Sequence, residues 1–131
     1  MTTEQVERSF PMSADSIDDI RTFVVERAVA AGFDERVSEE LADAVWEACS
    51  YAYRRSGRSG AVRVSWVSEE HSVEVTVRSE GAFTGDGEPE ESLETSLTMA
   101  MEMALVDEVH VDPGTDEEPR TEIRLVKFTG R

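Results

Sequence analysis

The residues that could do chemistry in this 131-residue sequence gather in one stretch, Glu47-Ala48-Cys49-Ser50-Tyr51-Ala52-Tyr53. A carboxylate can act as a general base when it lies beside a hydroxyl group that must lose its proton. Glu47 and Tyr51 are four residues apart, so on a helix both side chains would lie on one face. Two interpretations of Glu47 stay open, a general base and an ordinary polar helix residue, and we favour the second.

The other reactive residue types offer no arrangement with a recognisable chemistry. His71 and His110 are far apart in the sequence, and Cys49 is the single cysteine. A zinc site needs clustered ligands and a catalytic triad needs several groups in a fixed arrangement, so we predict neither a metal site nor a triad. One cysteine cannot form an internal disulfide, which is typical of proteins in a reducing compartment.

The sequence is strongly acidic, with 29 acidic against 13 basic residues and a formal net charge of -16. Nucleic acids and anionic membrane surfaces would repel such a chain, so we expect neither as a partner. A protein with a basic surface is the better electrostatic match, although solubility alone could also explain the charge. We expect no signal peptide and no membrane span, and hence a cytoplasmic protein.

Hydrophobic periodicity predicts the elements that must position these residues. Apolar steps of three and four predict helices over Ala14–Ala31, Asp34–Arg55 and about Ser92–Leu105, the first capped by Ser13 and closed by Gly32. Period-two alternation predicts strands over Val6–Phe10, Val62–Trp66, Val73–Val77, Val106–Val111 and Thr121–Phe128, with a glycine-rich acidic loop over Ser79–Glu91. This order predicts an α+β fold, a two-layer sandwich in which three helices cover one face of a mostly antiparallel sheet.

The stretch around Glu47, Ala44-Val45-Trp46-Glu47-Ala48-Cys49, resembles the first ATP-site motif of the bacterial anti-sigma factor serine kinases. These proteins belong to the GHKL superfamily of histidine kinase-like ATPases, and their motif runs Glu-Ala-x-Thr-Asn-Ala. In that family the Glu activates the substrate hydroxyl and the Asn helps to hold magnesium. Three further segments resemble the family's adenine-reading strand end, its lid-helix glycine run and its Leu-x-Asp-Glu-Val ending: Val77–Phe83, Ser96–Met101 and Leu105–Val109.

The resemblance covers nearly the whole chain, and it implies a single domain over residues 1–131 with the GHKL (Bergerat) fold. The chain departs from the family pattern at the positions that would contact the nucleotide. Tyr51 stands at the magnesium-holding Asn and Ser79 at the adenine-reading Asp, while Gly81 is kept but the next glycine of the motif is missing, so that Phe83 would crowd the base. Ser96 and Thr98 replace the two lid-helix glycines.

These departures predict that the ATP site is degenerate, that no cofactor is bound and that Glu47 is vestigial. We expect Tyr51 to fill the old pocket and to pair its hydroxyl with Ser79. The resemblance then implies an anti-sigma factor-like regulator, a homodimer that binds a sigma factor, an anti-anti-sigma antagonist, or both. The alternative is an active serine/threonine kinase that uses Mg-ATP to phosphorylate the antagonist, and a third reading is a small-molecule sensor that reuses the cavity.

Overall fold

The computed structural model describes residues 4–11, 13, 15–55, 61–79, 106–112 and 121–129. Its elements, in chain order, are β1 (Glu4–Pro11), α1 (Ser16–Ala30), α2 (Glu35–Arg55), β2 (Ala61–Ser68), β3 (Ser72–Ser79), β4 (Glu108–Asp112) and β5 (Glu122–Phe128). Each of them was predicted from periodicity. The third predicted helix, about Ser92–Leu105, and residues 80–91 of the predicted loop lie outside the described residues.

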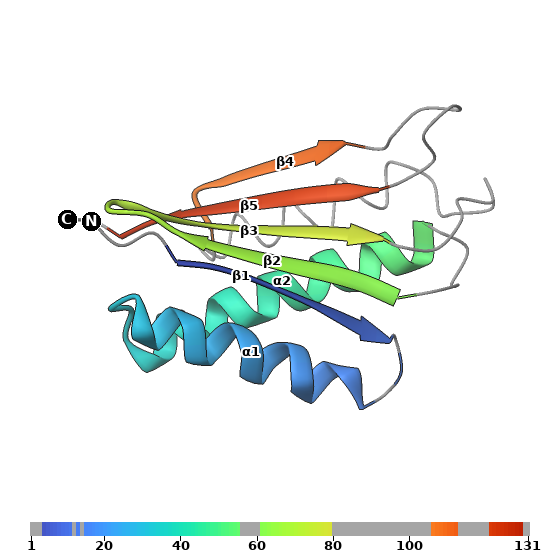
Figure 1. Cartoon of the computed structure of the whole chain (residues 1–131), viewed down its shortest axis with the longest axis horizontal. Coiled ribbons are helices and arrows are strands. Elements are labelled where there is room, and N and C mark those ends of the chain that lie inside the picture. The colour runs from blue at the N-terminus through green and yellow to red at the C-terminus, as the bar shows by residue number, and fades with distance from the viewer. Residues whose placement is uncertain are drawn as a thin grey trace.

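The five strands form one sheet in the order β1-β2-β3-β5-β4, and every neighbouring pair is antiparallel. Helices α1 and α2 lie side by side against one face of this sheet, and the two layers are plain in Figure 1. The α+β sandwich with an antiparallel sheet is therefore confirmed. Strand β5 follows β4 in the chain, but in the sheet it lies between β3 and β4.

Helix α1 begins at Ser16, two residues later than predicted, and Ser13 is not its cap. The N-cap position is Asp15, which makes no side-chain capping bond. The Ser13 hydroxyl lies 3.2 Å from the Ser16 hydroxyl, which itself donates a hydrogen bond to the carbonyl of Pro11. These bonds link the start of the helix to the end of β1, and this local arrangement replaces an ordinary serine cap.

The end of α1 follows the prediction closely. Gly32 has a φ of 102°, a left-handed conformation that glycine adopts without a steric penalty. Its N–H donates to the carbonyl of Val29 at 3.0 Å, and the N–H of Phe33 donates to the carbonyl of Ala28 at 3.1 Å. This pair of bonds is the Schellman motif, which satisfies the last carbonyl groups of a helix.

Helix α2 is capped by Asp34, whose carboxylate accepts a hydrogen bond from the Val37 N–H at 2.8 Å. An ion pair between Arg21 and Asp43 joins α1 to α2. The buried face of α2 is made mostly of small side chains, which let the helix approach the sheet closely: Leu41, Ala42, Ala44, Val45, Ala48, Cys49, Tyr51 and Ala52. Besides its contact with α1, this helix packs on the sheet mainly against β3, with further contacts to β2 and β5.

The core lies between the helices and one face of the sheet. Alternate residues of the central strands are buried there, and Trp66, Ile123 and Leu125 are at most 1% exposed. Phe10 and Phe23 meet edge to face with ring centroids 5.8 Å apart, which attaches β1 to α1. The opposite face of the sheet carries polar and charged side chains, as the alternation in the sequence predicts.

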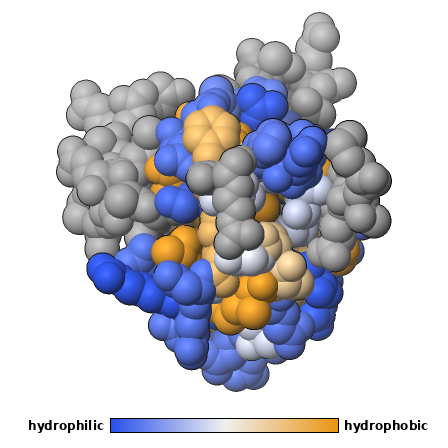
Figure 2. Space-filling model, turned by 90° about the vertical axis from the view of Figure 1, so that its left-hand side faces the viewer, coloured by the Kyte–Doolittle hydropathy of each residue, from blue (hydrophilic) through white to orange (hydrophobic). Residues whose placement is uncertain are grey.

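One end of the molecule carries exposed apolar side chains. Val29, near the end of α1, is 51% exposed, and Phe128, next to the β2–β3 turn, is 50% exposed. Figure 2 views this end and shows apolar atoms gathered among hydrophilic ones. Within the described part of the chain, no helix is both long and apolar enough to cross a membrane.

Two neighbouring residues of β5 test the assignment of the two sheet faces. Leu125→Ala should lower the free energy of unfolding by about 2–5 kcal/mol, because it leaves a cavity in the core. Val126→Ala, on the opposite face, should lower it by less than about 1 kcal/mol. Urea unfolding followed by Trp fluorescence measures both values, and equal losses for the two variants would contradict the assignment.

Candidate functional site

Helix α2 places the two residues of the Glu47 motif in different surroundings. Tyr51 is 3% exposed and belongs to the hydrophobic core, whereas Glu47 is exposed to solvent. Residues four apart on a helix differ by about 40° around its axis, so one can face the core while the other lies at its margin. Tyr51 is thus part of the core, where the sequence analysis expected it.

Cys49 lies on the same helix, two residues before Tyr51, and is fully buried as a free thiol. Burial raises the pKa of the Cys49 thiol well above its usual range, because the apolar surroundings disfavour the thiolate. The thiolate is the reactive form of cysteine. Cys49 is therefore a packing residue, and it supplies no nucleophile to this site.

Ser79 is the last residue of β3 and is 5% exposed. Its hydroxyl oxygen accepts a hydrogen bond from the Thr121 N–H at 3.1 Å, and its own N–H donates to the Thr121 carbonyl at 3.0 Å. The Ser79 hydroxyl oxygen thus pairs with the backbone of Thr121. The sequence analysis expected it to pair with the Tyr51 hydroxyl. This reciprocal pair joins β3 to the residue that precedes β5.

Thr121 was missed in the sequence analysis, although it lies at this site. It is 1% exposed, and its Oγ1 atom has no hydrogen-bond partner among the residues that the structure describes. A buried hydroxyl without a partner costs free energy, so such a group is unusual in a packed core. No local signal in the sequence marks Thr121, because its neighbour Ser79 is 42 residues away.

The remaining predicted site residues, Gly81, Phe83, Ser96 and Thr98, lie outside the described residues. In the described part of the chain, no three His, Cys, Asp or Glu side chains lie close enough together to hold a metal ion. The two histidines are exposed, and each has a carboxylate nearby: His71 lies 3.8 Å from Glu70 and His110 lies 2.9 Å from Glu108.

The family model of the histidine kinase-like ATPase domain matches residues 10–127, which is most of the chain. This protein belongs to that family. The match is consistent with the antiparallel sheet and the two helices on one of its faces. None of the curated proteins compared with this chain matches it significantly.

The family implies ATP as a cofactor, and two described positions bear on whether this histidine kinase-like ATPase domain fits it. Tyr51 stands where the related motif holds magnesium, and a phenol has no amide oxygen to offer the metal. Ser79 stands where the motif reads adenine, and it has no carboxylate, while its hydroxyl oxygen already accepts the Thr121 N–H. The side chains at these two positions do not fit Mg-ATP in the manner of the motif.

The two hydroxyl groups at the end of β3 and the start of β5 differ in a way that mutation can test. Ser79→Ala removes the acceptor of a buried N–H and should lower the free energy of unfolding by about 1–2 kcal/mol. Thr121→Val removes a buried hydroxyl that has no partner in the described part of the chain. The free energy of unfolding should therefore fall by less than about 0.5 kcal/mol or rise. Urea unfolding of both variants measures this, and a larger loss for Thr121→Val would contradict the hydrogen bonding described above.

Proposed function

We propose that this protein is an anti-sigma factor-like regulator that binds a sigma factor, an anti-anti-sigma antagonist, or both, and that it has lost ATP binding and kinase activity. This chain belongs to the histidine kinase-like ATPase family, and such regulators have the fold of that family. The resemblance of the Glu47 motif and of the Leu105–Val109 ending supports the anti-sigma branch of that family.

The observation that carries the loss of ATP binding is the burial of Tyr51. A residue that holds magnesium must present an oxygen atom to an accessible cavity. Tyr51 is 3% exposed and packs among the apolar side chains of α2 and the sheet. To restore a metal site there, the protein would have to withdraw a large aromatic side chain from its core. This would cost about 3–5 kcal/mol.

A protein that acts by binding alone needs a surface that attracts the right partner. The net charge of -16 favours a basic partner and speeds its encounter with this chain. Exposed acidic side chains on the outer sides of both helices contribute to this field: Asp18, Asp19, Glu26, Glu39 and Glu47. Exchange of partners would then depend on competition for this protein or on a separate kinase that modifies the antagonist.

The second candidate is an active serine/threonine kinase that phosphorylates an anti-anti-sigma factor with Mg-ATP. One observation favours it, because Glu47 is exposed and so remains accessible as a general base. In this reading Glu47 would take the proton of the substrate hydroxyl. The two candidates differ in whether nucleotide binds the folded protein.

Nucleotide binding is tested by thermal unfolding with and without a magnesium complex of a non-hydrolysable ATP analogue. We expect no change in Tm, whereas a ligand at 100 times its Kd would add about 2.7 kcal/mol to the free energy of unfolding. An ATP-binding histidine kinase-like domain run in parallel is the positive control. A saturable rise in Tm that persists in the Glu47→Gln variant, together with phosphate transfer from Mg-ATP that this variant abolishes, would establish the kinase instead.

Partner binding is tested by affinity capture from the native cell extract, with and without added ATP. We expect a sigma factor or a small antagonist protein to be captured equally well in both conditions, and equally well by Glu47→Gln. Sedimentation of the purified protein tests the expected homodimer. Recovery of neither kind of partner would overturn the regulator and favour the small-molecule sensor.

A further inference from the structure

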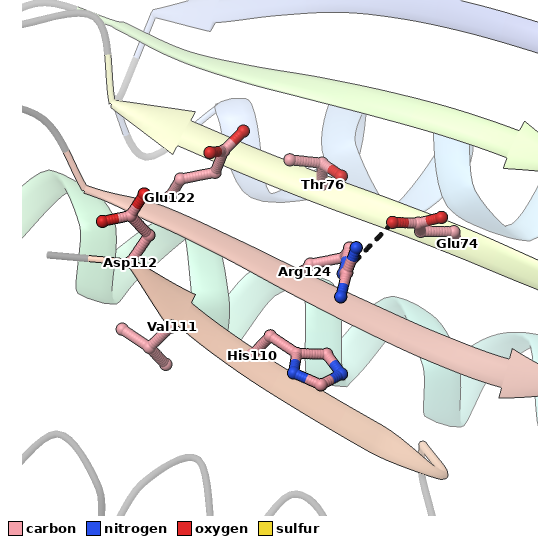
Figure 3. A pocket seen from close by; sticks show the side chains of 7 residues that line it. All are labelled: Glu74, Thr76, His110, Val111, Asp112, Glu122 and Arg124. Carbon is pink, nitrogen blue, oxygen red and sulfur yellow. Dashed lines mark ion pairs between the residues drawn. The ribbon is translucent and has the colours of Figure 1, made fainter. Parts of the chain in front are cut away.

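The face of the sheet away from the helices carries a hollow of about 370 Å³ over β3, β5 and β4 (Figure 3). The charged side chains there have neighbours of opposite charge within the molecule. The Arg124 Nε atom lies 3.2 Å from the Glu74 Oε1 atom. Glu122 stands opposite Asp112 on one neighbouring strand, but it stands opposite Arg78 on the other. This hollow therefore does not call for a charged partner.

Two arginines at the β1 edge of the molecule differ from this pattern. Arg8 lies on β1 and Arg27 on α1, and neither forms an ion pair within 4 Å in the described part of the chain. Four other described arginines do form ion pairs: Arg21 with Asp43, Arg36 with Glu40, Arg63 with Glu7 and Arg124 with Glu74. In a chain with 29 acidic against 13 basic residues, two such arginines are unexpected.

Both arginines stack on the pair of aromatic rings that joins β1 to α1. The guanidinium carbon of Arg8 lies 5.0 Å from the centre of the Phe10 ring, and that of Arg27 lies 5.4 Å from the centre of the Phe23 ring. The two rings are in edge-to-face contact, so these four residues form one arginine–aromatic cluster. Stacking orients a guanidinium group and leaves the N–H donors at its end available to acceptors.

The carboxylates that adjoin these arginines in the sequence do not face them. Glu7 lies on the opposite face of β1, where it pairs with Arg63 at 3.2 Å and accepts a hydrogen bond from the Ser65 hydroxyl at 2.9 Å. Glu26 directly precedes Arg27 in α1, so its side chain projects about 100° away around the helix axis. The arginine–aromatic cluster is therefore open to a carboxylate from another molecule.

Strand β1 is an outer strand of the sheet and pairs only with β2 in the described part of the chain (Figure 1). An edge strand offers backbone N–H and C=O groups to which an extended segment of another protein can add. Arg8 stands directly opposite Val64, a core residue, so it lies on the helix side of β1. In an added strand every second side chain would lie on this same side, next to the arginine–aromatic cluster.

We propose that the edge of β1 and the arginine–aromatic cluster form a docking site for an acidic, extended segment of a partner protein. The segment adds to β1 as a strand, and carboxylates on its helix side bind the guanidinium groups of Arg8 and Arg27. Charge complementarity selects this occupant.

The net charge of -16 does not exclude an acidic segment from this site. At physiological ionic strength, exposed charges more than about 8 Å apart are largely screened from each other, so the charges next to the segment decide. The site is also distinct from the acidic helix surfaces that would attract a basic partner. The proposal does not require the partner to be a sigma factor, and it holds for a nucleotide-binding protein equally well.

The test uses the full-length ¹⁵N-labelled protein and three synthetic peptides. The first alternates Val and Glu, the second has Gln in place of every Glu, and the third is the first with a methyl group on every backbone nitrogen. The second peptide has no side-chain charge, and the third cannot donate the hydrogen bonds of a strand. We expect the first to shift the amide signals of β1 and the side-chain Nε–H signals of Arg8 and Arg27. Each of the other two should bind about tenfold more weakly.

Two variants with the same change in net charge give the matched comparison. Arg8→Gln with Arg27→Gln should weaken binding of the Val-Glu peptide about tenfold. Arg36→Gln with Arg78→Gln, at exposed positions outside the cluster, should leave it within about twofold. The Arg27 Nε atom is buried, so Arg8→Gln alone, at an exposed position, provides a variant that leaves the core intact and should bind about threefold more weakly. Proper folding is checked from the amide spectrum of each free protein.

Several results would overturn the proposal. Absence of binding by the Val-Glu peptide at millimolar concentration would show that the edge does not accept such a strand. Equal binding of the Val-Gln peptide would show that charge does not select the occupant, and equal binding of the methylated peptide would exclude strand addition. Equal weakening by the two double variants would show that the peptide senses only the overall charge.

A second copy of this chain is the other possible occupant of the edge. A homodimer in sedimentation that dissociates in Arg8→Gln with Arg27→Gln would show that a second copy covers β1, and it would overturn the proposal. The nucleotide and capture experiments above do not depend on these outcomes, so the proposed function and this site can fail separately.

Discussion

The contact between helix α2 and strand β3 is the constraint on which the rest of the molecule depends. The helix turns a face rich in alanine toward the sheet, with Ala44, Ala48 and Ala52 fully or almost fully buried. Small side chains allow a close approach, and every larger residue on this face must then find its place in a tightly packed layer. The same contact therefore sets the surroundings of Cys49 and Tyr51 and determines which side chains between Glu47 and Tyr53 are accessible.

This constraint explains why the fold accommodates a tyrosine at position 51, where the motif that this stretch resembles has an asparagine. Polar groups aimed into an open cavity lower the stability of a protein, and their replacement by core residues commonly raises it. Tyr51 adds a large, nearly buried side chain to the cluster that joins α2 to the sheet. At the end of β3, the Ser79 hydroxyl accepts a hydrogen bond from the backbone of Thr121 and so extends the pairing of β3 with β5. Tyr51 and Ser79 therefore both contribute to the stability of the fold.

The sequence predicts the elements well because each of them follows from local periodicity. The alternation over Val73–Val77 and the steps of three and four along α2 both depend on residues close in the chain. The Gly32 turn was predictable for the same reason, since its left-handed conformation is a local preference of glycine. The cap of α1 was predicted wrongly at Ser13, because Ser16 bonds to Pro11 of the preceding strand and moves the start of the helix.

The parts of the site that escaped prediction depend on which strands become neighbours. Thr121 meets Ser79, and Asp112 meets Glu122, only because β5 lies between β3 and β4. Periodicity tells which face of a strand is polar, but it carries no information on strand order or register.

The two faces of the sheet therefore differ: one is buried against the helices and the other is polar. Its inner face is occupied by packing, so changes there alter stability first. The side chains of its outer face are polar and less buried, so a change of charge there costs less stability. A side chain on the outer face can therefore be exchanged for a binding role with less effect on the fold than one on the inner face.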